Sequence, residues 1–341
     1  MLTYITSRIL IMIPTLLGVL SVTFLLAQCM PGGPVEALLA STRGQSASGA
    51  QRLAELDPAR IAQIKAIYGF DEPAGKRYLK TVAHFARFDF GRSLKTNQGV
   101  FALIMEKLPV TVSLGLWSSL AAYLVSIPLG VAKAVRAGSR FDASTTVLII
   151  LGFSIPGFVL GVLLIVIFAG GSFLNWFPLR GLLSDNWSEL NWTARILDYL
   201  WHLVLPVTCL ALGSIASLTV LTRNAVLEEI GKQYVLVARA KGLPDRAVLY
   251  RHILRNALVP LVTGLPAAVV AVFFGGSLLI ETLFSLDGVG LLSYEALVRR
   301  DYPVVLAGVY LSTLFGLVAK LLADLAYISV DARIQLGRRV Q

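Results

Sequence analysis

The residues best placed to do chemistry gather in one polar segment, Gln233–Pro260, which reads QYVLVARAKGLPDRAVLYRHILRNALVP. With its flank, residues 223–255 carry seven basic side chains against three acidic ones, a net charge of +4. Such a segment can dock onto an acidic partner or a lipid surface. It holds no paired carboxylates, metal-ligand cluster or activated nucleophile, so its pattern predicts docking rather than catalysis.

Patterns for phosphate or metal binding are missing from the rest of the sequence. Gly75-Lys76 and Gly231-Lys232 lack both the upstream glycine and the following Ser or Thr of a phosphate-binding loop. The histidines and cysteines are isolated from one another: His84, His202, His252, Cys29 and Cys209. We therefore expect a chain that is not an enzyme by itself and that binds no metal or cofactor.

Within the polar segment, the spacing predicts two short helices joined by a turn. Leu236–Lys241 is helical in character, Gly242 suits a left-handed helix cap, and Pro244 can open the next helix. The second helix has an apolar stripe, with its arginines largely off that stripe: Val248, Leu249, Ile253 and Leu254 against Arg246, Arg251 and Arg255. From the residues alone, a docking element and an interfacial membrane helix remain equal alternatives.

The composition indicates where such a segment must be held. Of the 341 residues, 56% are hydrophobic and 15% charged, and the mean hydropathy is +0.74. An average soluble protein is about 25% charged, so a disordered chain, a disulfide scaffold and a typical cytosolic enzyme are excluded. The net charge of +10 fits the basic cytoplasmic loops of membrane proteins, and we expect no nucleic-acid partner.

A transmembrane helix needs about 20 apolar residues. Six stretches lack Asp, Glu, Lys and Arg: Ile9–Val35, Thr111–Ala132, Ala143–Leu179, Tyr199–Thr222, Asn256–Ile280 and Tyr302–Ala319. We predict an all-α polytopic membrane protein with six transmembrane helices, the first an uncleaved helix rather than a signal peptide. The third stretch is too long for one span, and Gly170-Gly171 indicates that its helix ends near Ala169.

Short loops predict the orientation. Lys133–Asp142, residues 223–255 and the tail after Val330 are net basic, whereas Glu281–Asp301 is net acidic. Both termini should therefore be cytoplasmic. The loop 31–108 is net basic yet falls on the outer side of the membrane. The preference of basic loops for the cytoplasmic side is weak for loops of this length. We expect this loop to form a small helical periplasmic subdomain with helices at Asp57–Tyr68 and Ala74–Arg87. The predicted division is a first transmembrane helix (1–30), this subdomain (31–108) and a five-helix transmembrane domain (109–341) with a cytoplasmic loop (223–256).

The string Ala238-Arg239-Ala240-Lys241-Gly242-Leu243, followed by His252 and Arg255-Asn256-Ala257-Leu258-x-Pro260, resembles the signature loop of permease subunits of bacterial ABC importers, in the dipeptide/oligopeptide branch. Further matching motifs span nearly the whole chain: Pro31–Pro34, Tyr68–Pro73, Phe88–Leu94, Thr282–Ser285, Gly288–Gly290, Arg300–Val304 and Asp331–Ile334. Leu114–Ser118, Ser139–Asp142 and Phe177–Leu182 look closest to Yej-type permeases.

This sequence departs from the family at one point. Importer permeases often carry Glu-Ala-Ala ahead of the loop glycine, and the triplet here is Leu236-Val237-Ala238. The resemblance of this loop to the family therefore depends on Ala238 and Gly242 and on the Arg255, Asn256 and Pro260 that follow. We assume no contact of the missing glutamate.

The resemblance implies an importer of the bacterial inner (cytoplasmic) membrane that takes up oligopeptides, and in the Yej-type subgroup microcin C-like peptide antibiotics. It implies a heterodimer with a second permease subunit, two ATPase subunits or one fused ATPase that use ATP and Mg, and a periplasmic peptide-binding protein. The residues expected to couple to the ATPase are Ala238, Arg239, Ala240, Lys241, Gly242, Leu243, Arg255, Asn256 and Pro260. The alternative is an ion-gradient-driven secondary transporter, which should hold a mid-span carboxylate; the spans offer only Asp324, near one end.

Few charges are available to line a transport path. We therefore expect contacts from hydroxyls, amides and backbone carbonyls, with Ser154, Ser217 and Asn224 as candidates. Glycine and proline interrupt the spans at many points, among them Pro128, Gly152, Pro156, Gly157, Pro206, Gly213, Pro260, Gly264, Pro266, Gly275 and Gly276. Most should be packing features, and a few should be the bends of alternating access.

Overall fold

The computed structural model describes residues 2–29, 72–170, 173–274 and 277–330. The predicted helix Asp57–Tyr68 and the motifs Pro31–Pro34 and Asp331–Ile334 lie outside these ranges. Within them the regular elements are helices, and a single isolated bridge joins Arg92 to Gly99. The chain divides into two compact units, 1–108 with 292–321 and 332–341, and 109–291 with 322–331.

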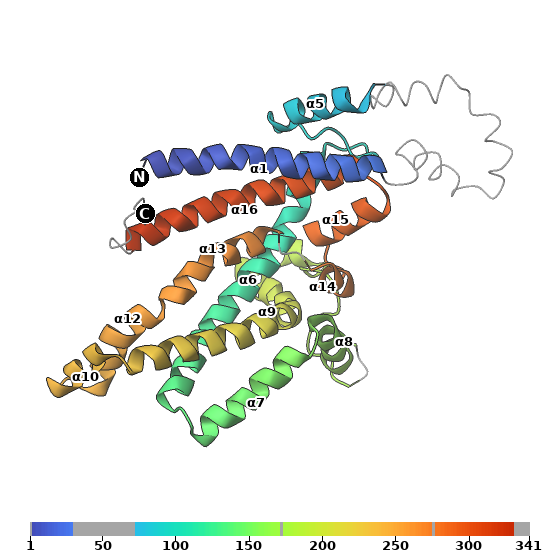
Figure 1. Ribbon diagram of the computed structural model, residues 1–341. Helices are drawn as coiled ribbons and strands as arrows, with labels where there is room; N and C mark the ends of the chain where they lie inside the picture. Colours follow the sequence, from blue (N-terminus) through green and yellow to red (C-terminus); the bar gives the residue numbers. More distant parts are fainter. Residues whose placement is uncertain (1, 30–71, 171–172, 275–276, 331–341) are drawn as a thin grey trace. The chain divides into compact units, whose positions relative to one another are not determined.

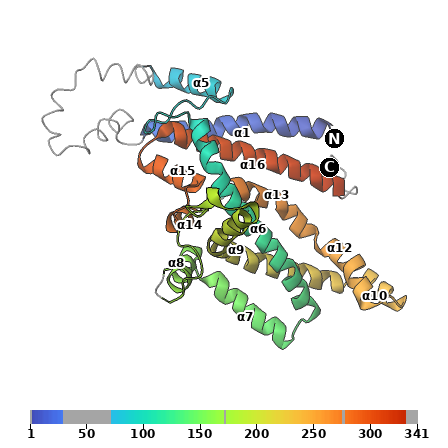
Figure 2. The ribbon, with the colours of Figure 1, turned by 180° about the vertical axis from the view of Figure 1, so that it is seen from behind.

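The first unit is built on helices from both ends of the chain. It contains α1 (Leu2–Cys29), α5 (Ala74–Phe85), most of α15 (Val289–Val298) and the first part of α16 (Tyr302–Val330). Figures 1 and 2 show α1 and α16 side by side, with α5 along α1. Tyr78 of α5 joins α1 through a hydroxyl contact of 2.6 Å with Ser21 and an edge-to-face contact with Phe24. The predicted helix Ala74–Arg87 is thus confirmed to within two residues.

A buried carboxylate organises the loop that follows α5. Asp301 is 4% exposed and accepts hydrogen bonds from the Ser93 hydroxyl at 2.5 Å and the Leu94 amide at 3.0 Å. Next to it, Phe85 and Phe90 pack against Tyr310 of α16. Two motifs some 208 residues apart, Phe88–Leu94 and Arg300–Val304, therefore meet in one structure.

The second unit holds the longest helices. It contains α6 (Val100–Val135, which begins in the first unit), α7 (Arg140–Ser154), α8 (Gly157–Phe168), α9 (Trp192–Ile230), α10 (Gln233–Ala240), α11 (Asp245–Ala247), a π-helical turn (Val248–Ile253), α12 (Leu254–Ala257), α13 (Val259–Phe274) and α14 (Leu278–Leu283). Helix α9 packs against both α7 and α8, and its Cys209 is buried in an apolar cluster with Leu205 and Ile280.

In the part of the chain that the structure describes, four helices are long and apolar enough to cross a membrane, and up to six spans result if each bent pair counts as one. The four are Tyr4–Leu26, Val100–Val135, Trp192–Ile230 and Tyr302–Leu322. The two bent pairs are Arg140–Ser154 with Gly157–Phe168 and Asp245–Ala257 with Val259–Phe273. Each of the six predicted stretches overlaps one of these segments.

Two of the predicted spans are interrupted. The third bends by 97° between α7 and α8, because Ile155 is extended and Pro156 precedes the first residue of the new helix. Its predicted end near Ala169 is right, since Phe168 is the last residue of α8. The fifth, Asn256–Ile280, is likewise not one helix, because Ser277 is extended and α14 begins only at Leu278.

Lys133 is not the loop charge that the sequence indicated. It lies in the last turn of α6, is 1% exposed, and donates to the Asp142 carbonyl, Thr145 and Thr146, each at 2.8 Å. Its ammonium is 3.1 Å from the Asp142 carboxylate, which also accepts two hydrogen bonds from Arg223 at 2.9 and 2.7 Å. This ionic cluster ties the ends of α6, α7 and α9 together.

Candidate functional site

The polar segment forms a compact helical hinge, defined here as Gln233–Ala257. Helix α10 ends in a turn in which the Gly242 amide donates to the Arg239 carbonyl at 2.9 Å and the Leu243 amide to the Ala238 carbonyl at 3.3 Å. These two bonds form the Schellman motif, which needs a left-handed residue at its centre. Gly242 supplies it with φ +77°, so the predicted glycine cap is confirmed.

The second half of the hinge is one continuous helical segment of mixed type. Pro244 precedes α11, and the chain then passes through the π-helical turn into α12. Pro244 itself stays extended, which agrees with its predicted place at the start of the second helix. Single π-helical turns are frequent at functional sites because they re-aim side chains within a helix.

The hinge has its own apolar core, which attaches it to the ends of α6 and α9. Seven buried residues form this hinge core: Ala134, Val226, Val235, Ala238, Val248, Ile253 and Ala257. Leu249 and Leu254 pack against it, so the predicted apolar stripe faces the protein. The predicted loop 223–256 therefore begins as helix, since α9 continues to Ile230, and it continues as a packed element.

A buried carboxylate clamps the start of the hinge. Glu229, 8% exposed, accepts hydrogen bonds from the Lys232 ammonium and the Tyr234 hydroxyl. Asn256 donates to the same hydroxyl at 3.2 Å. Burial, together with the bond to Glu229, raises the pKa of Tyr234, so this phenol remains a proton donor. The clamp joins the first and last turns of the hinge.

The outer face of the hinge combines apolar and basic side chains. Leu236, Val237 and Tyr250 are each more than half exposed, and Leu243 is 39% exposed. Arg239, Lys241, Arg246, Arg251 and Arg255 are exposed on the same element. Exposed apolar groups next to cations on a rigid turn are typical of a protein-docking surface.

The predicted coupling residues do not all share this face. Arg239, Ala240, Lys241, Gly242 and Leu243 are exposed together at the turn, and Arg255 is exposed on α12. Ala238 is instead 6% exposed and belongs to the hinge core, so its small side chain permits close packing within this chain. Asn256 is tied to Tyr234, and Pro260 lies in the first turn of α13.

Sequence reasoning missed several residues of the site. Leu236, Val237 and Tyr250 were not singled out, although an apolar residue that falls off the buried stripe is a detectable signal. Glu229 and Tyr234 were not singled out either, although the spacing of Glu229 and Lys232, three residues apart, is a local signal for their ion pair. Of the candidate path residues, Ser154 and Ser217 are exposed and donate to the carbonyls of Ile150 and Gly213 on their own helices, and Asn224 is exposed.

The fold combines helices that can cross a membrane with a packed helical hinge whose outer face carries exposed apolar and basic side chains. A family model for binding-protein-dependent transport system inner membrane components matches residues 126–336, which include the hinge. Three curated relatives match nearly end to end. The peptidoglycan transport system permease protein YejB of Agrobacterium fabrum is 47% identical over 98% of this chain and 99% of its own. The inner membrane ABC transporter permease protein YejB of Escherichia coli O157:H7 is 46% identical over 98% and 99%. The oligopeptide transport system permease protein AppB of Bacillus subtilis is 34% identical over 97% and 99%.

The chain therefore belongs to the family of binding-protein-dependent transport system inner membrane components. It is a multi-pass protein of the bacterial inner membrane. The ion-gradient-driven alternative finds no support among these relatives, which are named as permease proteins of transport systems.

Proposed function

We propose that this chain is a permease subunit of an ATP-binding-cassette importer that takes up oligopeptides delivered by a periplasmic binding protein. Family membership and relatives named for peptidoglycan, oligopeptide and dipeptide transport support this. The observation that carries it is the hinge, whose Schellman turn presents exposed cations and apolar groups from a packed core. A rigid element of this kind can transmit a displacement from an ATPase to the transmembrane helices.

The same proposal assigns the partners and the topology. The chain pairs with a second permease, two ATPase subunits or one fused ATPase hydrolyse MgATP, and this chain has no enzymatic role. It crosses the membrane six times if each bent pair is one span, with both termini and the hinge in the cytoplasm. Residues 1–30 form the first span, 31–108 a periplasmic subdomain and 109–341 the permease domain. Arg239–Leu243 and Arg255 then meet the ATPase, and Ala238, Asn256 and Pro260 hold these residues in place.

The partners can be tested by purifying the tagged chain from native membranes in several mild detergents. We expect an ATP-binding-cassette ATPase and a second permease to co-elute, and a chain that always elutes alone would contradict the proposal. A photoreactive amino acid at Lys241 should crosslink to the ATPase. The same probe at Leu79, an exposed residue of α5, is the matched control and should not.

The substrate class can be tested in proteoliposomes that contain the importer and its binding protein. The panel comprises linear oligopeptides, a microcin C-like peptide and a peptidoglycan-derived muropeptide, because one relative is named for peptidoglycan transport. ATP-dependent uptake of any of these supports a peptide importer. Uptake that follows an ion gradient and ignores ATP would favour the secondary transporter.

A further inference from the structure

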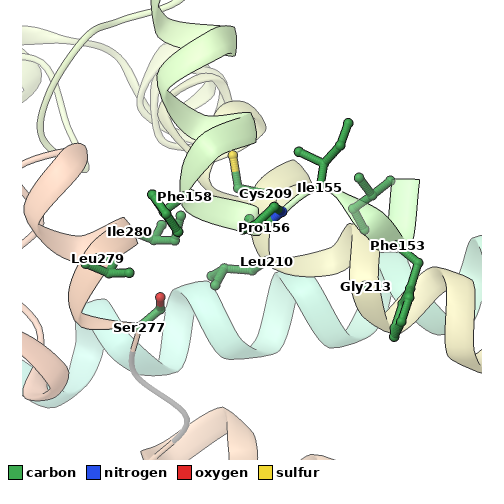
Figure 3. Close-up of a pocket in the computed structure, with 12 residues that line it drawn as sticks. Phe153, Ile155, Pro156, Phe158, Cys209, Leu210, Gly213, Ser277, Leu279 and Ile280 are labelled. Atoms are coloured by element: carbon green, nitrogen blue, oxygen red, sulfur yellow. The ribbon is translucent and has the colours of Figure 1, made fainter. Parts of the chain in front are cut away.

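Two helix interruptions, far apart in the sequence, meet on one cavity in the second unit. The first is the 97° bend between α7 and α8 at Ile155 and Pro156. The second lies before α14, where Ser277 precedes its first residue. The middle of α9, from Cys209 to Gly213, closes the space between them (Figure 3).

The cavity has a volume of about 400 Å³, within the roughly 300–1,000 Å³ typical of small-molecule sites. Its walls are chiefly apolar and include Phe153, Phe158, Leu210, Leu212, Leu279 and Ile280. The hydroxyl of Ser277 is the exception, and its oxygen is directed toward the space between Leu210 and Leu279 in Figure 3. Such a lining accepts an apolar group and offers a hydroxyl to a polar neighbour of that group.

The walls on the α8 side are fixed by close backbone packing. A Cβ on Gly157 would lie 2.9 Å from the Cys209 carbonyl oxygen, and one on Gly161 would lie 2.6 Å from the Leu283 side chain. Gly157 therefore allows α8 to approach the backbone of α9 closely, and Gly161 leaves room for the Leu283 side chain. Gly213 differs, because a Cβ there would meet no atom within 4 Å; it borders open space.

In the proposed six-span topology, the bend between α7 and α8 lies within the third span and cannot face lipid. Helix ends leave peptide groups without intrahelical partners, and α8 has no side-chain cap. Non-helical backbone at membrane depth is tolerated only against protein or along a water-filled cavity. Ile155 and Pro156 are exposed in this chain, so the bend belongs to a partner contact or a water-filled path. Interrupted transmembrane segments mark substrate sites in other transporters for the same reason.

We propose that this cavity is a subsite of the transport path that receives an apolar side chain of the transported peptide. The inference rests on the proposed function, because it takes the substrate class from it. The apolar walls hold the side chain, and Ser277 meets the peptide backbone. Uptake should then depend on the fit of one side chain to the space beside Gly213.

The test is a Gly213→Leu variant of the whole importer, which fills the cavity from α9 without a strained backbone. Uptake of two matched peptides is measured, one with alanine and one with phenylalanine at each position in turn. We expect phenylalanine to reduce uptake at least tenfold more in the variant than in the wild type, with alanine peptides within twofold of wild type. The matched control is Gly18→Leu, an exposed glycine of α1 that also has no atom within 4 Å of its Cβ.

An equal loss for both peptides in a correctly assembled variant, or no change for either, would overturn the subsite. A wild-type importer without ATP-dependent peptide uptake would instead overturn the proposed function. If Gly213→Leu fails to assemble, Ser277→Cys is treated with a membrane-impermeant thiol reagent, and the wild-type chain gives the background. Labelling that phenylalanine peptides slow and alanine peptides do not supports the subsite, and an unlabelled cysteine or equal protection contradicts it.

Discussion

Gly242 permits a graded test of whether the hinge turn couples ATP hydrolysis by the ATPase to peptide transport. Its φ of +77° lies in the left-handed region, which glycine adopts freely and other residues adopt at a cost. We consider substitution by asparagine, alanine, valine and proline. A Cβ at this position would meet no atom within 4 Å, so the backbone conformation alone sets the cost.

The expected magnitudes follow from that conformation. Alanine in the left-handed region costs about 1–2 kcal/mol, which corresponds to roughly a 5- to 30-fold loss in an equilibrium constant. Asparagine should cost less, because it visits this region more readily, and the β-branched valine should cost more. Proline cannot adopt the turn, because its ring fixes φ near −65°.

The assay is peptide-stimulated ATP hydrolysis and peptide uptake by the importer purified with its partners. Both activities should fall in the order Gly242, Asn, Ala, Val, Pro, while the amount of inserted chain stays constant. The control is Gly91→Ala in the loop after α5, since Gly91 has φ +73° and no atom within 4 Å of its Cβ. It has the same backbone cost outside the hinge and should leave coupling unchanged. Normal uptake by Gly242→Pro, or an equal loss in Gly91→Ala, would refute the role of the turn.

Three further predictions concern packing and polar anchoring. Val235→Ala removes two methyl groups from the hinge core at a cost of about 2 kcal/mol and should speed trypsin cleavage at the hinge arginines. The control Val237→Ala, on the exposed face, should leave the cleavage rate unchanged. Equal cleavage rates of the two variants would contradict a packed hinge. Asp142→Asn leaves Lys133 and Arg223 without their shared anion, so it should lower the Tm in detergent more than Lys133→Met does. The double variant should recover part of this loss. If the two changes in Tm simply add in the double variant, the ionic cluster is excluded. Asp301→Ala removes the acceptor for the Ser93 hydroxyl and the Leu94 amide and should speed hydrogen exchange of residues 94–98. The control Glu295→Gln breaks only exposed pairs with Lys95 and Arg299 and should leave that exchange unchanged. Unchanged exchange in Asp301→Ala would refute the anchor.

Local features of the fold were predictable from the sequence. Stretches without charge predicted each apolar segment, and Gly242 was identified correctly because a left-handed cap depends on neighbouring residues alone. Proline breaks were not predictable in the same way. Pro14, Pro128 and Pro206 lie inside helices α1, α6 and α9, whereas Pro156 stands at a 97° bend. The difference depends on whether neighbouring elements satisfy the freed backbone groups.

The site was only partly predictable, because burial depends on distant partners. Ala238 is buried through contacts with residues of α6 and α9, and nothing in the hinge sequence specifies that they fold onto it. Lys133 and Asp142 are nine residues apart, and their pairing depends on how α6 and α7 meet. The exposed turn Arg239–Leu243 was predictable because it is held by hydrogen bonds within Ala238–Leu243.

The hydrogen bond between Ser93 and Asp301 also sets the order in which native contacts form during synthesis of the chain. Its two residues are separated by 208 positions, so the loop after α5 has no buried acceptor until nearly the whole chain has left the ribosome. At roughly 5–20 residues per second, that interval is on the order of 10–40 s. The segment near the beginning of the chain is thus among the last to acquire its native contacts, and a nascent chain that stalls before α16 leaves the Ser93 hydroxyl and the Leu94 amide without their Asp301 acceptor.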